Sequence, residues 1–420
     1  MIGGAWCRAI DKAVLFVLYA YNRRLFVTQF RIGLVVILLL ATALPGDAQV
    51  PKQAVSGEIH PHGRLARTSF YDTPTPLPVA PAGSLIRSEQ FDGYALPPGV
   101  SATRILYHSR SSSGTDVPVS GVILIPNRSA PAGGWPIIAW AHSFQGIARE
   151  CAPSLLENLG EGSYFAMYTK LGYAVILTDY AGLGTNFQSS YLNLRSHALD
   201  VISAVRAARS ATPELGAKWI AMGEGEGAAV ATTVAETEND LREHGFLGSL
   251  ALGGLADAEN IASRWIQSNP IGMIYVAEAI KAEFPQFEPS EVLTSQAMTY
   301  YRRALASCDA VSELPLLSAN QVLKQGWQEN RFVRQYFEAN TLGRKSASRP
   351  ILILISDSSS SIPVAMTNQA VRRLCSQRDA VLYQKLKSTD SKTLVGDSVG
   401  EQIAWIRARF SDEHQESNCD

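Results

Sequence analysis

A short glycine-rich turn in the middle of the chain is the first place where residue types and spacing could support chemistry. Residues 223–227 read Gly-Glu-Gly-Glu-Gly, follow the apolar run 219–222 and precede an alanine-rich helical pattern at 227–236. Strand, Gly-x-x-x-Gly and helix are typical of a nucleophile elbow, a sharp turn that exposes the side chain of its central residue. Here that residue is Gly225. The pattern therefore predicts a nucleophile position that holds no nucleophile.

The segments around this turn predict the sheet that must hold it. Apolar runs typical of buried parallel strands occur at 136–141, 173–178, 219–222, 249–252 and 351–355, with a further strand expected at 380–385. Helical patterns occupy 155–171, 194–209, 227–236, 364–375 and 399–410. The runs 102–108 and 117–125 are expected to pair at the start of the domain. This alternation predicts an α/β fold with a mostly parallel, doubly wound sheet.

The alternation stops over residues 256–348, where helical spacing continues without a strand pattern. We interpret this stretch as a helical cap inserted over the carboxyl edge of the sheet, where such folds bind ligands. The core then comprises 96–255 and 349–412, followed by a polar tail at 413–420. Residues 49–95, rich in Pro, Ser and Gly, are interpreted as a leader draped over the domain or partly disordered.

The N-terminal segment 1–48 has the features of an export signal. Residues 32–44 are apolar or small and follow Arg23, Arg24 and Arg31. The run is shorter than the roughly 20 residues that a transmembrane helix needs, which favours a secretory signal peptide. Small residues at positions 46 and 48 predict cleavage just before Gln49. The alternative is an uncleaved membrane anchor, and either interpretation places the body outside the cytoplasm, in the periplasm or secreted.

Composition and cysteine content exclude other classes. Lys and Arg number 37 against 38 Asp and Glu, a near-neutral balance that argues against a nucleic-acid partner. Apolar residues make up 46% of the chain, which argues against disorder. Removal of the signal would leave Cys151, Cys308, Cys375 and Cys419, which allow three pairings in an oxidising compartment. Their spacing shows no metal-ligand pattern, and we expect neither metal nor cofactor.

Four separated blocks carry a family resemblance. They read GGWPIIAWAHSFQGIARECAPS at 133–154, GYAVILTDYAGLGT at 172–185, VRAAR at 205–209, and RPILILIS, IPV and RRLC between 349 and 375. In this order they resemble the secretory lipase family of α/β-hydrolases, the lipase A type, and the similarity covers about 92–410. The resemblance implies the α/β-hydrolase fold and a Ser-Asp-His triad for ester hydrolysis. It also implies that Cys151 pairs with Cys308 and Cys375 with Cys419.

The chain departs from the family at all three triad positions. Gly225 takes the place of the nucleophile, Ser359 that of the acid and Ser391 that of the base, where relatives carry His. A small register shift would place Asp357 at the acid position. Because removing triad members costs on the order of 10⁴ to 10⁶ in turnover, these changes predict a catalytically degenerate protein.

The oxyanion region differs as well. Relatives tend to read His-Gly-Thr after the third strand, whereas this chain has His142, Ser143 and Phe144. These side chains are expected to narrow the space beside a reacting carbonyl, and loss of one oxyanion donor costs about 10² to 10³ in rate. Glu226 also belongs to this region; it and Glu224 flank the vertex of the elbow, at positions where lipases commonly carry His, Tyr or Gln.

Other residues leave alternatives open. Ser143 or a serine of the run 358–361 could replace the nucleophile, although neither has a histidine partner at a known spacing. Glu224 and Glu226 could form an acid/base pair, or cap the following helix. His197 is interpreted as a surface or structural residue. The aromatic residues of the cap are interpreted as its core, with a ligand-holding cap as the alternative; they are Tyr300, Tyr301, Trp327, Tyr336 and Phe337.

Together these observations predict an exported pseudohydrolase. Its expected role is to bind an apolar small molecule under the cap or a protein partner, with membrane contact only through an uncleaved N-terminal segment. The alternative is an active serine esterase or lipase that hydrolyses triacylglycerol-type acyl esters with a non-standard site. A structural role in an envelope assembly has no positive support in the sequence.

Overall fold

The computed structural model describes residues 63–241, 244–359, 361–387 and 391–419, apart from the side chains at 310, 391 and 392. All of them belong to the compact unit Gln53–Asp420. The expected signal segment 1–48 and the first part of the expected leader, 49–62, lie outside the described residues. Among the helices that are described, none is long and apolar enough to cross a membrane.

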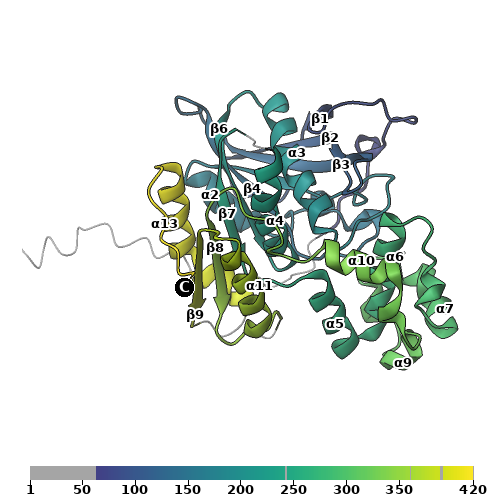
Figure 1. Ribbon diagram of the computed structural model, residues 1–420. Helices are drawn as coiled ribbons and strands as arrows, with labels where there is room; N and C mark the ends of the chain where they lie inside the picture. The colour runs from purple at the N-terminus through teal and green to yellow at the C-terminus, as the bar shows by residue number, and fades with distance from the viewer. Residues whose placement is uncertain (1–62, 242–243, 360, 388–390, 420) are drawn as a thin grey trace, which may run out of the picture. The chain divides into compact units, whose positions relative to one another are not determined.

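The described residues form a nine-stranded sheet at the centre of this unit (Figure 1). Its strands, in sheet order, are β1 (Leu85–Gln90), β2 (Val100–Arg110), β3 (Asp116–Pro126), β5 (Ala174–Thr178), β4 (Trp135–Ala141), β6 (Leu215–Glu224), β7 (Phe246–Leu252), β8 (Ile351–Ser356) and β9 (Val381–Leu386). The pairs β1–β2, β2–β3 and β3–β5 are antiparallel. The remaining pairs are parallel, which confirms the predicted mostly parallel sheet.

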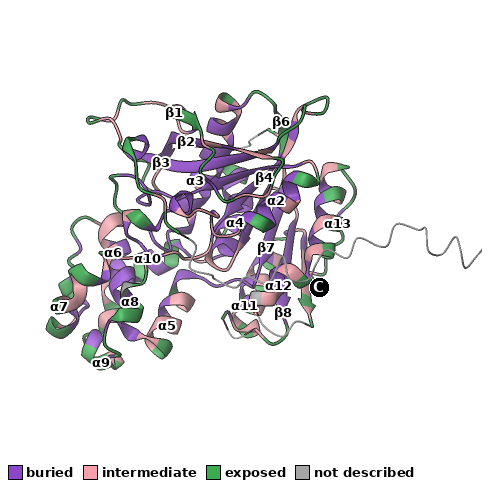
Figure 2. Ribbon diagram, turned by 180° about the vertical axis from the view of Figure 1, so that it is seen from behind, coloured by how far each residue is buried: buried purple, intermediate pink, exposed green. Residues whose placement is uncertain are grey.

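Helices cover both faces of the sheet and bury its apolar side chains (Figure 2). One face packs against α3 (Leu194–Ala211), α4 (Glu226–Leu241) and α11 (Val364–Ser376). The other packs against α2 (Gly162–Lys170), α12 (Ser391–Asp397) and α13 (Val399–Phe410). Strand β4 shows why its apolar run is continuous: Ile137 belongs to the first face, whereas Trp140 packs edge-on against Tyr164 of α2 on the second. Alternate side chains of a strand point to opposite faces, so a strand buried on both is apolar throughout.

The helical insertion forms a cap with a hydrophobic core of its own. Its helices are α5 (Ala258–Ser268), α6 (Met273–Glu283), α7 (Ser295–Ala304), α8 (Ala310–Glu313), α9 (Ala319–Val322) and α10 (Arg331–Ala339). Figure 1 shows them gathered at one end of the sheet, away from α13 and β9. Tyr336 and Phe337 are buried in the cap core, and Tyr300, Tyr301 and Trp327 pack against it, which confirms their predicted packing role.

Two stretches differ from the predicted elements. Strand β1 lies inside the segment interpreted as a leader; it is an edge strand whose sequence, LIRSEQ, lacks the apolar run of a buried strand. The helical pattern predicted for 155–171 yields only the helix Gly162–Lys170. Leu159 and Gly160 have positive φ angles of 58° and 86°. A right-handed helix does not include such angles, so the helix begins only after these two residues.

The cap is fastened to the core in two ways. The ends of the insertion lie side by side, since the Leu342 N–H donates to Asp257 Oδ1 at 2.8 Å and the Ala258 N–H to the Asn340 oxygen at 3.3 Å. Away from these stems, the disulfide Cys151–Cys308 joins the loop after β4 to the segment between α7 and α8. A second disulfide, Cys375–Cys419, joins α11 to the C-terminal tail, so both pairings implied by the resemblance are confirmed.

Candidate functional site

The glycine-rich turn has the geometry of a nucleophile elbow. Strand β6 ends at Glu224, Gly225 has a φ of 59°, and α4 begins at Glu226. The Gly225 N–H donates to the Leu252 oxygen at 3.0 Å. A Cβ at Gly227 would lie 2.0 Å from the Ala141 oxygen, so the close approach of α4 to β4 requires glycine there. The backbone of the elbow is therefore intact, although its vertex has no side chain.

A cavity of about 380 Å³ lies over this vertex, and we call it the large cavity. Its volume falls in the range of small-molecule sites. Half of its lining residues have aromatic or aliphatic side chains: Phe144, Tyr191, Leu192, Ile261, Trp265 and Ile362. The other half have polar side chains or, at Gly225, none: Ser143, Gly225, Glu226, Arg264, Ser268 and Ser361. Among the described residues, no histidine lines this cavity.

Phe144 joins the core loop to the aromatic residues around the cap. Its ring centroid lies 4.7 Å from that of Tyr191, 5.4 Å from that of Tyr275 and 6.1 Å from that of Trp265. The indole N–H of Trp265 donates to the Tyr191 hydroxyl at 3.1 Å. The loop after β4, where the oxyanion donors of a hydrolase would stand, thus supplies an aromatic wall of the large cavity.

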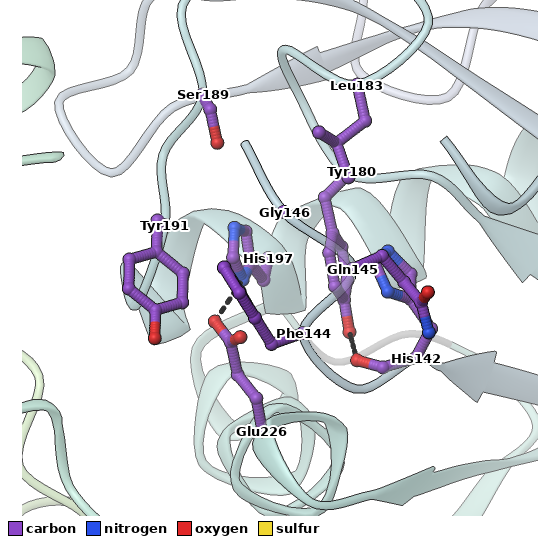
Figure 3. A pocket seen from close by; sticks show the side chains of 10 residues that line it. All are labelled: His142, Phe144, Gln145, Gly146, Tyr180, Leu183, Ser189, Tyr191, His197 and Glu226. Atoms are coloured by element: carbon purple, nitrogen blue, oxygen red, sulfur yellow. Dashed lines mark hydrogen bonds and ion pairs between the residues drawn. The ribbon is translucent and has the colours of Figure 1, made fainter. Parts of the chain in front are cut away.

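Three aromatic rings are stacked behind this wall (Figure 3). The Tyr180 ring lies between His142, at a centroid distance of 4.2 Å, and His197, at 4.1 Å. The His142 nitrogens face backbone oxygens, with Nδ1 2.6 Å from the Ser143 oxygen and Nε2 3.2 Å from the Asp179 oxygen. Burial lowers the pKa of His142. Its ring therefore holds the loop in place and is not directed toward the elbow vertex.

His197 and Glu226 face each other beside the stack. His197 is only 3% exposed. Of the two roles that the sequence left open, the burial therefore favours the structural one over the surface one. Its Nδ1 lies 3.6 Å from Glu226 Oε1 and has no hydrogen-bond partner among the described residues. Both side chains line a second space of about 10 Å³, barely large enough for one water molecule, which we call the small cavity (Figure 3).

Burial determines the charge of this pair. Burial raises the pKa of Glu226 to about 7, although the hydrogen bond from the Leu192 N–H to its carboxylate lowers that pKa in part. Burial lowers the pKa of His197 to about 3. Below neutral pH the proton therefore stays on the carboxyl group and the imidazole is uncharged. The two side chains are not an ion pair, and they are not poised as a charged acid/base couple.

Glu224 and Glu226 do not act on the same space. Glu226 begins α4 and lines both cavities, whereas Glu224 lines neither. Burial, reinforced by the nearby carboxyl group of Glu161, raises the pKa of Glu224 to about 7. The two glutamates flank the vertex, and of the two only Glu226 lines a cavity. This arrangement gives no support to an acid/base pair, whereas Glu226 does stand in the first turn of the helix, as the capping alternative expects.

The residues at the other two triad positions do not converge on the large cavity. Ser359 does not line it, and its buried Oγ has no hydrogen-bond partner among the described residues. Asp357 is exposed and also lies outside the lining, so a register shift does not supply a carboxylate. Ser391 begins α12, and its side chain is not described. Ser143 and Ser361 do line the cavity, and no described histidine lines it with them.

Several residues of the site were not singled out from the sequence. On α5, Ile261, Arg264 and Trp265 all line the large cavity. Their spacing of three and four residues places them on one helix face, which is the signal that could have found them. Tyr191 lies in a loop without periodicity, and only the packing of the cap reveals its place.

Fold and site now define a class: an α/β-hydrolase-type sheet and elbow with an inserted helical cap. The sequence model of the secretory lipase family matches residues 163–418, and the chain belongs to that family. Search of the curated proteins gives no significant match.

Solved structures share the fold at low sequence identity. The closed state of Candida antarctica lipase A is 15% identical with a TM-score of 0.72, over 85% of this chain and 89% of that one. The rice cell wall degrading esterase LipA from Xanthomonas oryzae is 20% identical with a TM-score of 0.64, over 79% of this chain and 99% of its own. A hydrolase-like protein from Legionella pneumophila is 16% identical with a TM-score of 0.64, over 79% and 100%. These likenesses confirm the predicted fold class.

Proposed function

We propose that this protein is a non-catalytic member of its family that binds an apolar small molecule in the large cavity. The observation that carries the proposal is the vertex itself. Gly225 lies in the lining of a cavity of about 380 Å³, in which no described histidine takes part. The space for a ligand is present, and its described lining includes neither a side chain at the vertex nor a histidine.

Rate arithmetic supports a binding role over slow catalysis. A serine hydrolase needs the hydroxyl that attacks and the imidazole that removes its proton. Loss of either costs on the order of 10⁴ to 10⁶ in turnover, and loss of an oxyanion donor costs about 10² to 10³ more. The walls that would hold an acyl chain remain, since Phe144, Ile261 and Trp265 line the cavity. The names of the structural relatives, a lipase and an esterase, favour acyl compounds as the ligand class.

Export is the setting that we propose for this function. Membership of a secretory family and two disulfides agree with an exported protein. An oxidising compartment keeps such disulfides formed. We further propose that the signal segment is cleaved just before Gln49 and that the mature protein is periplasmic or secreted. N-terminal sequencing of the exported protein would test this directly.

Activity-based labelling separates a binding protein from an esterase. The purified protein is incubated with a fluorophosphonate probe and with p-nitrophenyl acyl esters, and a heated sample serves as control. We expect no labelled serine and no turnover above that control. Stoichiometric labelling of any serine would overturn the proposal, and a Ser143→Ala variant would show whether the hydroxyl in the cavity is the one that reacts.

Ligand binding is measured on the same preparation. Trp265 lines the cavity, so its fluorescence reports on an apolar ligand placed beside it. We expect medium-chain acyl compounds to change this emission and to raise the melting temperature, and we expect a Trp265→Phe variant to lose the emission change. If none of these ligands alters the melting temperature, a protein partner replaces the small molecule as the working hypothesis.

A further inference from the structure

One unpaired cation faces the large cavity. Among the described residues that line it, Arg264 is the only basic residue and Glu226 the only acidic one. Arg264 is half-buried on α5, and its guanidinium has neither hydrogen bond nor ion pair with any described residue. By contrast, Arg373 near the cap stems is paired with Asp257 at 2.5 Å. The half-buried guanidinium remains partly solvated, and an anionic group entering the cavity would supply the charged hydrogen-bond partner that it lacks among the described residues.

Glu226 is not the missing counter-ion. Its Oε1 accepts the Leu192 N–H at 3.1 Å and faces His197, and no ion pair joins it to Arg264. Burial raises the pKa of this carboxyl group to about 7, so at and below neutral pH it carries a proton for much of the time. No other aspartate or glutamate lines the cavity among the described residues. Below neutral pH the described lining of the cavity therefore presents the positive charge of Arg264 without an opposing carboxylate.

We propose that the large cavity selects an acidic amphiphile, a single carboxylate on an unbranched apolar chain, and that Arg264 is the counter-ion of that carboxylate. This inference rests on the proposed binding function and adds to it the charge of the ligand. The planar guanidinium matches a carboxylate with two parallel N–H···O bonds. The aromatic and aliphatic walls, among them Phe144, Ile261 and Trp265, supply the surface against which the chain packs.

The same arrangement predicts that a neutral ester binds less tightly than the corresponding acid. An ester offers the same chain but no charge, so it leaves the guanidinium unpaired while covering it with apolar atoms. A serine hydrolase needs the opposite preference, because it must bind the ester and release the acid. Selectivity for the acid therefore distinguishes this cavity from a functioning hydrolase pocket.

The test compares matched ligands and matched variants. Dodecanoate and methyl dodecanoate, both below their micelle concentrations, are titrated into the purified protein, with Trp fluorescence and calorimetry as readouts. We expect dodecanoate to bind at least about tenfold tighter than the ester. Arg264→Gln should abolish this difference, and Arg264→Lys should keep part of it. Arg334→Gln, an exposed arginine of α10 that lines neither cavity, is the control and should change nothing.

Each outcome bears on a different claim. Equal affinity for acid and ester, unchanged in Arg264→Gln, overturns this inference and leaves the binding function in place. Absence of binding by either compound overturns both. The melting temperature of each variant without ligand shows whether it is folded, and the Arg264→Lys variant keeps the test decisive if Arg264→Gln proves unstable.

Discussion

His197 Nδ1 lies 3.6 Å from Glu226 Oε1, and these two buried side chains stand directly beside the vertex of the elbow. The pair resembles a catalytic couple in its residue types, yet burial lowers the pKa of His197 to about 3 and raises that of Glu226 to about 7, so both side chains are neutral between these pH values. A neutral couple costs less to bury than a charged one. We therefore regard the pair as a packed polar element that supports the cavity wall.

Replacing Glu226 with Gln should make the protein more stable at alkaline pH. The pKa of Glu226 is about 7 in the folded protein against 4.5 for an unperturbed glutamate. Below pH 4.5 the group is protonated in both states and contributes no pH dependence. As pH rises from 4.5 to 7 the unfolded state loses its proton first, so folding stability falls. The variant avoids this loss and should gain about 3 kcal/mol at pH 8.

Urea unfolding at pH 4.5 and pH 8 measures the effect. The control is Glu313→Gln, at an exposed position of α8. The change in unfolding free energy that this substitution causes should be the same at both pH values. A Glu226→Gln gain that is equal at both pH values would contradict the argument, because a change in packing alone does not depend on pH.

Introducing a serine at the vertex should not create an esterase. In the variant Gly225→Ser, the new Cβ would lie 3.3 Å from Ser143 Cβ and the backbone would keep a φ of 59°. Together we expect these to cost about 1–2 kcal/mol of stability. The introduced hydroxyl would have no imidazole to remove its proton, since no described histidine lines the cavity. Fluorophosphonate labelling is therefore expected to stay at background.

Gly114→Ser is the matched control for this variant. Gly114 also has a positive φ, 88°, but a Cβ there meets nothing within 4 Å. The loss of stability in Gly114→Ser therefore measures the cost of a serine at positive φ without the contact to Ser143. If Gly225→Ser reacted rapidly with the probe, some histidine outside the described lining would have to reach the vertex.

The two disulfides should differ in how much they stabilise the protein. Cys151–Cys308 closes a loop with a sequence separation of 157, and Cys375–Cys419 one of 44. Removing either by paired Cys→Ser substitution should cost about 2–5 kcal/mol, with the longer loop costing about 1 kcal/mol more because it restricts the unfolded chain further. Urea denaturation of the two double variants gives the comparison. A larger loss for the shorter loop would contradict this ordering.

Shortening Phe144 should enlarge the binding space at the expense of stability. The ring packs against Tyr191 and Tyr275 and borders both cavities. Because it is only partly buried, Phe144→Ala should cost about 1–3 kcal/mol, less than a fully buried phenylalanine. Branched acyl ligands should then raise the melting temperature of the variant more than that of the native protein. Phe187→Ala, which is 38% exposed, should leave both stability and ligand range unchanged.

The fold could be predicted because its signals are local and strong. The run ILILI reads as a buried strand, and the structure makes β8 of Ile351–Ser356. Residues 399–410 were expected to form a helix and do so as α13. The edge strand β1 was missed since it is half-exposed and its sequence carries no period. The elbow was found from glycine spacing alone, because close backbone approach leaves no other residue possible at Gly227.

The site could be predicted only in part. Gly225, Ser143, Phe144 and Glu226 share the large cavity, as their places around the elbow suggested. Arg264 could not be found in this way, because its relation to the elbow depends on how the cap folds back over the core. For His197 the sequence left a surface and a structural role open, because a helical position near Arg195 has no mark of burial, and its 3% exposure favours the structural role. The helical spacing on α5 marks a shared face, but only three-dimensional packing shows that this face lines the cavity.

The attachment of the cap has a consequence for how quickly molecules exchange with the cavity. The paired stems at Asp257 and Leu342 would form a hinge, but the bond from Cys151 to Cys308 holds the cap at another point. A cap attached to the core at two separate points cannot rotate as a rigid body about its stems. We therefore expect the cap to keep its position while molecules enter and leave, and to become more mobile once a reductant breaks the disulfide.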